Sequence, residues 1–317
     1  MNSAREKELT CLVREKAMEL GFDLCGIARV RKLDEREPFL IKWVETGMHG
    51  GMAFLERDMA KRLNPSILLP GAKSVIVTGL NYFNEMKQGL NGVPVISRYA
   101  YGFDYHNIIL KKLGQILENI KISHPTVNGK AFVDSSPILE KAWAVEAGLG
   151  WQGRHSLLIN RKIGSFFFIG VLLIDTDLEY DEKFTGDHCA ECSMCVEACP
   201  VNAINDNRTI DARKCISYHT IENKGPVPED LSGKFEGRVF GCDKCQEVCP
   251  WNSTAKIHTV PEFSISPELE KMTREEWMSI TQDDFNRIFM NSPVKRIKYS
   301  GMLRNIEIAF KRGFPPH

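Results

Sequence analysis

The order of hydrophobic and polar residues predicts that helices and strands are mixed through residues 1–180. Residues 3–20 carry apolar side chains at helical spacing, and Gly21 follows as a residue suited to end a helix. A strand-like segment covers residues 22–30, and a second helix is expected over residues 38–46, with a proline in its first turn. A domain of helices packed on a sheet is the architecture that this order favours.

Two strongly apolar segments predict the central strands of that sheet. Residues 73–80 and 166–174 are apolar on both alternating faces, so each needs burial on both sides. A further strand, over residues 130–134, ends in the carboxylate of Asp134, and a helix that ends near Gly148 follows it. In α/β folds reactive groups gather where a strand ends and a helix begins, so Asp134 is a candidate site residue.

Asp134 has two interpretations at this stage. In apolar surroundings its carboxyl would keep a proton near neutral pH and could act as a general acid. It could equally cap the helix that follows, as aspartate often does. The sequence leaves both interpretations open.

Two loops gather groups that could contact a ligand. Residues 49–57 combine adjacent glycines with Arg57, whose guanidinium could clamp a phosphate, a carboxylate or a carboxamide, although a plain turn is the alternative. Residues 97–106 concentrate aromatic side chains with Asp104 and His106 just before a helix. Helix capping for Asp104 and a surface or first-turn position for His106 are the structural alternatives.

The segment from residue 189 to residue 250 carries the most specific signal. It opens with a C-x2-C-x2-C-x3-C-P run and closes with a shorter C-x2-C-x3-C-P run. The first spacing is that of bacterial ferredoxins, in which three cysteines bind one 4Fe-4S cluster and the fourth reaches a second. The shorter run lacks one ligand, and Cys215 is the only cysteine between the runs. Exchanging the last cysteine of each run gives Cys189, Cys192, Cys195 and Cys249 for one cluster, and Cys199, Cys215, Cys242 and Cys245 for the other.

Eight cysteines thus form two complete sets of four, which favours clusters over the other roles of cysteine. Zinc also uses C-x2-C pairs but rarely this longer spacing. Disulfides would need an oxidising compartment, and the charged N-terminal segment has none of the apolar character of a signal peptide. Cys11 and Cys25 are left over and are expected to be buried thiols.

Composition adds a general expectation about class and charge. The chain has 317 residues, of which 43% are hydrophobic and 26% charged, and its longest apolar segment is too short to span a bilayer. A cytoplasmic enzyme without a membrane segment is therefore expected. The formal net charge is zero, so nucleic acid would have to bind a local patch. Residues 293–317 offer one, for which a solvated helix face is the alternative: Lys295, Arg296, Lys298, Arg304, Lys311 and Arg312.

Six segments, taken together with the cysteines, resemble the epoxyqueuosine reductase family over essentially the whole chain. They are residues 49–55, 98–106, 133–141, 150–153, 215–222 and 241–252. That family is similar in fold and chemistry to reductive dehalogenases, which also join a cobalamin domain to two 4Fe-4S clusters. The resemblance implies that the chain reduces epoxyqueuosine to queuosine at the wobble position of tRNA, the last step of queuosine biosynthesis. Electrons would pass through both clusters to cobalamin.

The resemblance also implies a mixed α/β fold: a cobalamin-binding sheet-and-helix domain like that of reductive dehalogenases, fused to a ferredoxin-like module. Residues 1–180 would form the catalytic domain, residues 181–260 the module with both clusters, and residues 261–317 a helical segment with a basic tail. Asp134 would be the proton donor. The residues implied to contact cobalamin are Arg57, Ser97, Asp134, His155, Leu158, Ile169 and Ser217.

The implied partners are a tRNA that carries epoxyqueuosine and an external low-potential electron donor, with a monomeric enzyme. Many family members have a C-terminal helical-repeat extension that helps to hold tRNA, and this chain ends at His317 without it. RNA contacts are therefore expected on Lys224, Lys295, Arg296 and Lys298. Two rival functions stay open: a dehalogenase-like cobalamin enzyme that acts on a small molecule, and a ferredoxin-type electron-transfer subunit, which predicts iron without cobalt.

Overall fold

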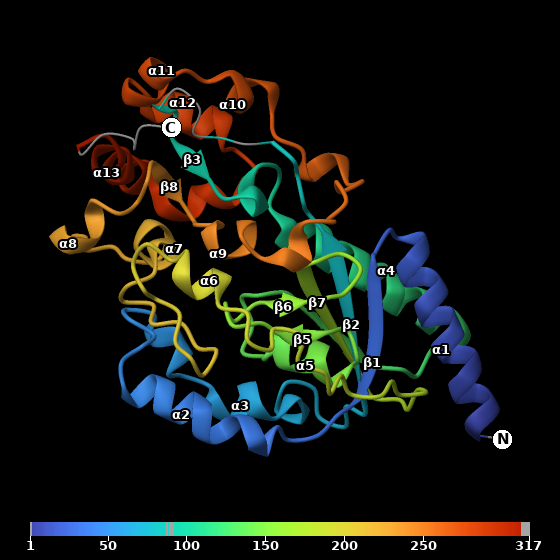
Figure 1. Cartoon of the computed structure of the whole chain (residues 1–317). Helices are drawn as coiled ribbons and strands as arrows, with labels where there is room; N and C mark the ends of the chain where they lie inside the picture. Colours follow the sequence, from blue (N-terminus) through green and yellow to red (C-terminus); the bar gives the residue numbers. More distant parts are fainter. Residues whose placement is uncertain (1, 87, 89–91, 312–317) are drawn as a thin grey trace.

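A four-stranded antiparallel sheet forms the centre of the predicted catalytic domain (Figure 1). The computed structural model describes residues 2–86, 88 and 92–311. The strands lie in the order β1 (Leu24–Arg29), β2 (Ser74–Asn81), β7 (Phe167–Ile174) and β4 (Gly129–Phe132). β2 and β7 are the inner strands and are almost entirely buried, because their side chains are apolar on both faces. This confirms the prediction of two central strands.

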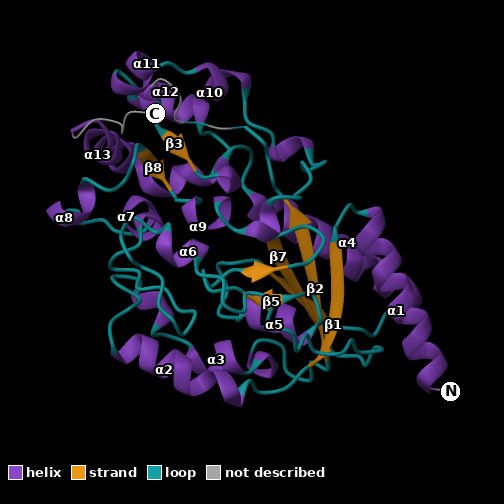
Figure 2. Ribbon diagram, in the orientation of Figure 1, coloured by secondary structure: helices purple, strands orange, loops and turns teal. Residues whose placement is uncertain are grey.

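Helices cover both faces of this sheet, as the secondary-structure colours show (Figure 2). α1 (Asn2–Glu19) and α4 (Tyr105–Ser123) share a hydrophobic core with one face, and that core includes Val13 of α1 and Leu172 of β7. α5 (Glu140–Glu146) covers the other face around the fully buried Trp143. The alternating side chains of the strands therefore serve two separate cores.

Shorter elements surround the sheet. α2 (Glu37–Glu45) and α3 (Met59–Leu63) precede β2, and β5 (Trp151–Gln152) pairs with β6 (Leu158–Ile159) in a small sheet of its own. These two short strands therefore do not join the central sheet. Single turns of 3-10 helix are η1 (Asp34–Arg36), η2 (Ala53–Leu55), η3 (Pro65–Ile67), η5 (Arg98–Ala100), η6 (Pro250–Asn252), η7 (Pro261–Phe263) and η8 (Pro293–Ile297).

The cysteine-rich segment folds into short helices and one strand. The helices are α6 (Met194–Glu197), α7 (Ile216–Ile221), α8 (Glu229–Ser232) and α9 (Lys244–Glu247). Its strand, β8 (Arg238–Phe240), pairs in parallel with β3 (Val95–Ile96), which comes from the predicted catalytic domain. The module is thus joined to the first part of the chain by backbone hydrogen bonds.

The C-terminal helices pack on this two-stranded sheet in the upper half of the molecule (Figure 1). They are α10 (Pro267–Lys271), α11 (Arg274–Met278), α12 (Gln282–Ile288) and α13 (Lys298–Lys311). One hydrophobic core there contains Ile96, Phe240 and Trp277, one residue from each predicted part. The division at residues 180 and 260 is therefore a proposal about function, since this core crosses both boundaries. Over the described ranges, no helix has the length and apolar character needed to cross a membrane.

Candidate functional site

The seven cysteines of the two runs, together with Cys215 between them, lie in two neighbouring groups. Burial raises the pKa of the Cys249 thiol to about 11, and the nearby thiols of Cys189, Cys195 and Cys192 also raise it. In the other group, burial holds the pKa of Cys245 well above its usual range, with further contributions from Cys242 and Cys215, and Cys199 in turn acts on Cys215. The structure therefore brings together the same two sets of four that the spacing predicts.

The first group surrounds a cavity of about 220 Å³. Its four cysteines line this cavity together with His155 and Trp251, and the Trp151 indole donates a buried hydrogen bond of 3.4 Å to Cys189 Sγ. Across the described ranges, no three His, Cys, Asp or Glu side chains converge on a point that one metal ion could occupy. A four-iron cluster binds each cysteine to a different iron and needs a wider frame, so these residues fit that group.

Asp134 lies just beyond β4 and accepts hydrogen bonds from an element that is distant in sequence. Tyr105 Oη donates to Asp134 Oδ2 over 2.7 Å, and His106 Nε2 lies 3.6 Å from the same oxygen. The other nitrogen of that ring, His106 Nδ1, lies 2.7 Å from Asp104 Oδ1. The start of α4 thus places a histidine between two carboxylates.

The expectation that apolar surroundings keep Asp134 protonated is wrong. Burial would raise the pKa of Asp134, but hydrogen bonding to His106 and Tyr105 outweighs burial and holds that pKa below its usual value. Burial lowers the pKa of His106, but bonding to Asp104 and Asp134 outweighs it and raises that pKa to about 9. At neutral pH the proton of this pair therefore resides on His106.

The capping alternatives are also settled by the structure. The N-cap of α5 is Leu139, so Asp134 does not cap that helix. Asp104 does cap α4, because its side chain accepts a hydrogen bond from the His106 backbone. Asp134 instead adopts the left-handed backbone conformation with φ of 47°, which is uncommon for a residue with a side chain.

Asp134 is accessible to solvent but crowded by protein atoms. Its side chain is 69% exposed to solvent, yet desolvation by surrounding atoms is the largest influence on its pKa. Two neighbours in the first turn of α5 share this character: burial, with Asp134 second, raises the pKa of Glu140 to about 8, and burial lowers the pKa of Lys141. The sequence analysis missed both, because charged residues at the start of a helix are ordinary and no spacing marks them.

Two orphaned buried polar atoms, one on His155 and one on Glu140, test whether cobalamin fits. His155 Nδ1 accepts a hydrogen bond from the Leu157 backbone, which leaves the ring proton on Nε2, and this atom is buried with no partner among the described residues. Burial, together with the charge of Lys141, lowers the pKa of His155 to about 4, so the ring is neutral. Glu140 Oε1 is also buried without a partner in the described part of the chain. A corrin carries amide groups around an apolar ring, so unpaired donors and acceptors of this kind suit it.

Apolar residues predicted to contact cobalamin lie on the same side of the sheet as α5. Leu158 is buried in the core that contains Trp143, and Ile169 packs against that core with part of its surface exposed. Leu158 and Ile169 thus belong to the core on the α5 face, the charge of Lys141 in the first turn of α5 reaches His155, and the residues present fit the cofactor.

Three other predicted cobalamin contacts lie elsewhere in the structure. Ser97 is buried against the second cysteine group, where a Cβ at Gly241 would lie 2.2 Å from its hydroxyl. Ser217 occupies the first turn of α7, directly after Cys215, and Arg57 is exposed in the turn that follows η2. The roles assigned to these three residues stay predictions.

The adjacent glycines of the loop at residues 49–57 serve a contact within the protein. The Gly51 backbone donates a 2.7 Å hydrogen bond to Tyr218 Oη, and a Cβ at Gly50 would lie only 2.7 Å from the Tyr218 ring. This loop, which the sequence suggested for ligand binding, is therefore attached to α7 beside Cys215.

Basic residues from two parts of the chain gather near Asp134. Burial lowers the pKa of Lys224, and the charges of Arg296, Arg304 and Lys298 lower it further. Arg296 Nε lies 2.7 Å from Glu222 Oε1. This hydrogen bond raises the pKa of Arg296 against the opposing effect of burial, and the charge of Asp134 raises it a little further. Lys295, Arg296 and Lys298 are exposed, whereas Arg312 of the predicted patch lies outside the described residues, as does the side chain of Lys311.

The two remaining cysteines differ from expectation. Cys11 is exposed on the outer side of α1, so the prediction that it is buried is wrong, because the core contacts of α1 come from Leu9, Val13 and Ala17. Cys25 is half-buried, and burial raises the pKa of its thiol to about 11.

Comparisons with known proteins agree on one family. A family model described as "4Fe-4S double cluster binding domain" matches residues 188–252, and one described as "Epoxyqueuosine reductase QueG, DUF1730" matches residues 62–135. Epoxyqueuosine reductase from Cellulophaga algicola is 48% identical over 93% of this chain and 96% of the relative. The protein of that name from Escherichia coli K12 is 39% identical over 95% of this chain and 80% of the relative.

Solved structures give the same result. An epoxyqueuosine reductase bound to an epoxyqueuosine-modified tRNA-Tyr stem loop is 28% identical, with a TM-score of 0.87 over 96% of this chain and 81% of that one. The Bacillus subtilis enzyme, in a structure whose aspartate catalytic loop is swung out of the active site, is 27% identical, with a TM-score of 0.89 over 96% and 82%.

Proposed function

The chain belongs to the epoxyqueuosine reductase family, and from that premise we propose that it reduces epoxyqueuosine to queuosine at the wobble position of tRNA. One observation of the structure carries the proposal: His155, which lines the cavity of the first cysteine group, lies within reach of the charge of Lys141, and Lys141 also acts on Asp134 beside His106. A related protein has been solved with an epoxyqueuosine-modified stem loop, which supports tRNA as the substrate. With relatives at 39–48% identity, neither a small-molecule dehalogenase nor a simple electron-transfer subunit is favoured.

The cofactors are two 4Fe-4S clusters and cobalamin, and the cobalamin, when bound, supplies the electron-rich centre that reduces the epoxide. His155, Leu158 and Ile169 would hold the corrin on the α5 face of the sheet, with Glu140 Oε1 and His155 Nε2 bonding to its amides. Arg57, Ser97 and Ser217 remain further candidates for this contact. His155 also lines the cavity of the first cysteine group, so we place that cluster next to the cobalamin and the second cluster farther from it.

The protein's own residues supply the proton. Conversion of an epoxide to an alkene consumes two electrons and two protons and releases water, so the epoxide oxygen must be protonated. We propose that His106, which holds the proton at neutral pH, passes it through the Asp134 carboxylate to this oxygen. Tyr105 fixes the carboxylate orientation through its hydrogen bond.

The loop of Asp134 is a candidate for movement during this step. A relative has been solved with its aspartate catalytic loop swung out of the active site. Here Asp134 stands between β4 and α5 in a left-handed conformation and is held by the Tyr105 and His106 side chains of α4. We propose that these two contacts define the closed position of the loop.

Substrate and electrons arrive from outside the chain. Lys224, Lys295, Arg296 and Lys298 gather near Asp134 and would contact tRNA phosphates. An external low-potential donor would reduce the clusters one electron at a time. The enzyme would act as a monomer. Because the substrate is tRNA, we place the reaction in the cytoplasm.

Anaerobic incubation tests the proposal. The reconstituted protein would be mixed with cobalamin, a low-potential reductant and epoxyqueuosine-containing tRNA, and the nucleosides would then be analysed. Queuosine is expected, with about eight iron atoms and one cobalt per chain. Protein that carries both clusters and cobalamin but leaves epoxyqueuosine unchanged would overturn the proposal. Iron without cobalt uptake would point instead to an electron-transfer subunit.

A further inference from the structure

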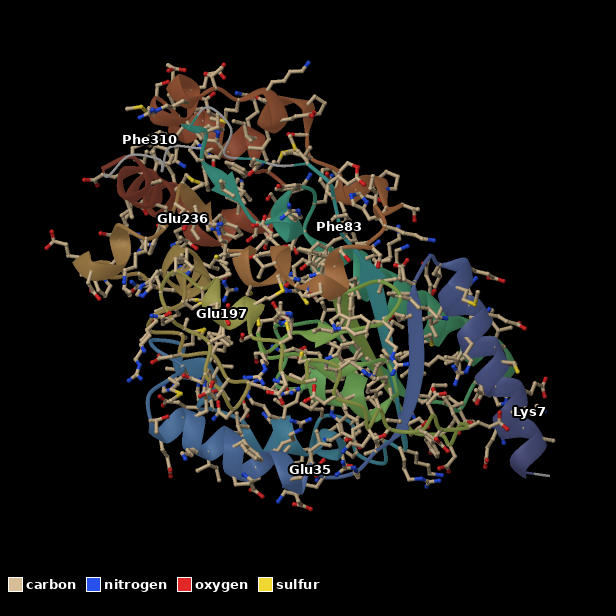
Figure 3. All side chains as sticks on the ribbon, in the orientation of Figure 1. Lys7, Glu35, Phe83, Glu197, Glu236 and Phe310 are labelled. Carbon is tan, nitrogen blue, oxygen red and sulfur yellow. The ribbon has the colours of Figure 1, made fainter. Side chains whose placement is uncertain are left out.

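A buried cation stands beside the second cysteine group. Arg238, on β8, is only 7% exposed, and its Nη1 donates to Glu236 Oε2 over 2.9 Å and to the Phe235 carbonyl over 3.3 Å. Glu236, which is labelled beside β8 in Figure 3, also accepts a hydrogen bond from Lys244 over 3.3 Å. Nothing in the proposed reaction uses this pair.

Arg238 acts directly on a cluster ligand. Arg238 and Cys242 line one cavity of about 730 Å³, and only residues 239–241 separate them in the chain. Phe235, whose carbonyl accepts the Arg238 hydrogen bond, belongs to a hydrophobic core against which the Cys242 side chain packs, as do those of Cys199 and Cys215. The guanidinium is therefore close enough to influence charge on this sulfur, in surroundings where water screens little.

We propose that the Arg238–Glu236 pair sets the reduction potential of the cluster bound by Cys199, Cys215, Cys242 and Cys245. When the external donor gives one electron to this cluster, the donor is oxidised, the cluster becomes more negative by one charge, and no bond forms or breaks. A buried cation stabilises the reduced cluster and raises its potential, whereas the carboxylate of Glu236 offsets part of that effect. The pair thus acts by position, without touching substrate or cobalamin.

The first cysteine group has a different partner, which provides a matched control. Trp151 donates its buried indole N–H to Cys189 and packs edge-on against Trp251, with ring centroids 5.0 Å apart. Hydrogen bonds to cluster sulfurs also raise the potential. Removing this donor should therefore affect the first cluster alone.

The inference rests on the two-cluster assignment and on no particular substrate. The experiment is a potentiometric titration of the reconstituted protein, followed by electron paramagnetic resonance. Arg238→Gln should lower the potential of one cluster, Glu236→Gln should raise the potential of the same cluster, and Arg238→Lys should stay near wild type. Trp151→Phe should lower the potential of the other cluster. Each variant is first checked for an iron content near that of wild type and for an unchanged circular dichroism spectrum.

Opposite signs from two neighbouring substitutions separate an electrostatic role from general disturbance, which would shift both variants in one direction. Shifts of the same sign, or no shift in Glu236→Gln, overturn the proposal. If Arg238→Gln loses its cluster, Glu236→Gln and Arg238→Lys still decide the question. Wild-type turnover of epoxyqueuosine-containing tRNA is measured separately, so failure here is distinguishable from failure of the proposed function.

Discussion

Asp134 and His106 decide where the site keeps its proton. Asp134→Asn keeps the size of the side chain and can still accept the Tyr105 hydrogen bond, but an amide cannot transfer a proton. We expect iron and cobalamin content to stay at wild-type levels, while queuosine formation falls by about 10²- to 10⁴-fold, the usual contribution of general acid catalysis. Asp206→Asn, in an exposed loop, is the control. An Asp134→Asn enzyme with unchanged turnover would remove this residue from the mechanism.

His106 gives a pH-dependent prediction. Its folded pKa of about 9 lies above its ordinary value of 6.5, so the protonated form persists through neutral pH and is lost as pH rises through about 9. Any stability from this charge is likewise complete below pH 6.5 and lost as pH rises through about 9. Wild-type kcat/KM should therefore fall on the alkaline side near pH 9.

In His106→Gln the partner that most lowers the pKa of Asp134 is gone, so that pKa should rise toward its usual value. The proton store is lost with it, and the alkaline fall in kcat/KM should move to lower pH. Pre-steady-state and steady-state rates across the pH range would measure this. An alkaline limb that stays at the wild-type pH would show that His106 does not supply the proton.

Some features of the site could be predicted from the sequence and others could not. The cysteine sets and Asp134 stand in specific motifs, so spacing and resemblance found them. The protonation state of Asp134 depends on Tyr105 and His106, which the fold brings from another element. The sequence pattern does not show that these two side chains lie beside Asp134, so it predicted a raised pKa for this carboxyl where the structure lowers it.

At the scale of elements, the loop at Gly50 packs tightly against Tyr218 of helix α7. Gly50 has φ of 62°, and an added Cβ would lie 2.7 Å from the Tyr218 ring. Gly50→Ala should lower the free energy of unfolding by about 1–3 kcal/mol for the left-handed backbone, with further loss from the clash. Denaturant titration measures this.

Gly71→Ala is a matched control, because Gly71 has φ of 80° and nothing lies within 4 Å of its added Cβ. The difference between the two alanine variants isolates the contact with Tyr218. Equal losses in both would show that the tight packing of Gly50 on Tyr218 contributes nothing.

Other elements show why the fold was only partly predictable. β2 and β7 are long apolar segments whose burial follows from composition, and both were predicted as central strands. β3 is two residues long and β8 three, and they lie far apart in the chain, so no local pattern predicts their pairing. The sheet is antiparallel, so Asp134 owes its position to its own loop rather than to the carboxyl edge of a parallel sheet.

At the scale of the whole molecule, the upper half joins the insert to the C-terminal helices. The third core unites residues from β3, β8 and α10–α13, which fixes Lys224 near Arg296 and Lys298. Lys224 and the basic residues of the tail, which the sequence analysis named as expected RNA contacts, thus lie together close to Asp134. Arg296 is already paired with Glu222, so the exposed lysines are the better candidates for RNA phosphates.

Changing Lys224, Lys295 and Lys298 together to glutamine should weaken tRNA binding and reduce its salt dependence. Each lost phosphate contact should lower the slope of log affinity against log salt by about 1. The control is the triple glutamine variant of Lys7, Lys111 and Lys121, exposed lysines of α1 and α4. Both variants have the same net charge, so only a difference in slope assigns the contact to this patch. Equal affinities and slopes in the two variants would return the patch to an ordinary solvated surface, and tRNA would then have to reach Asp134 along another face.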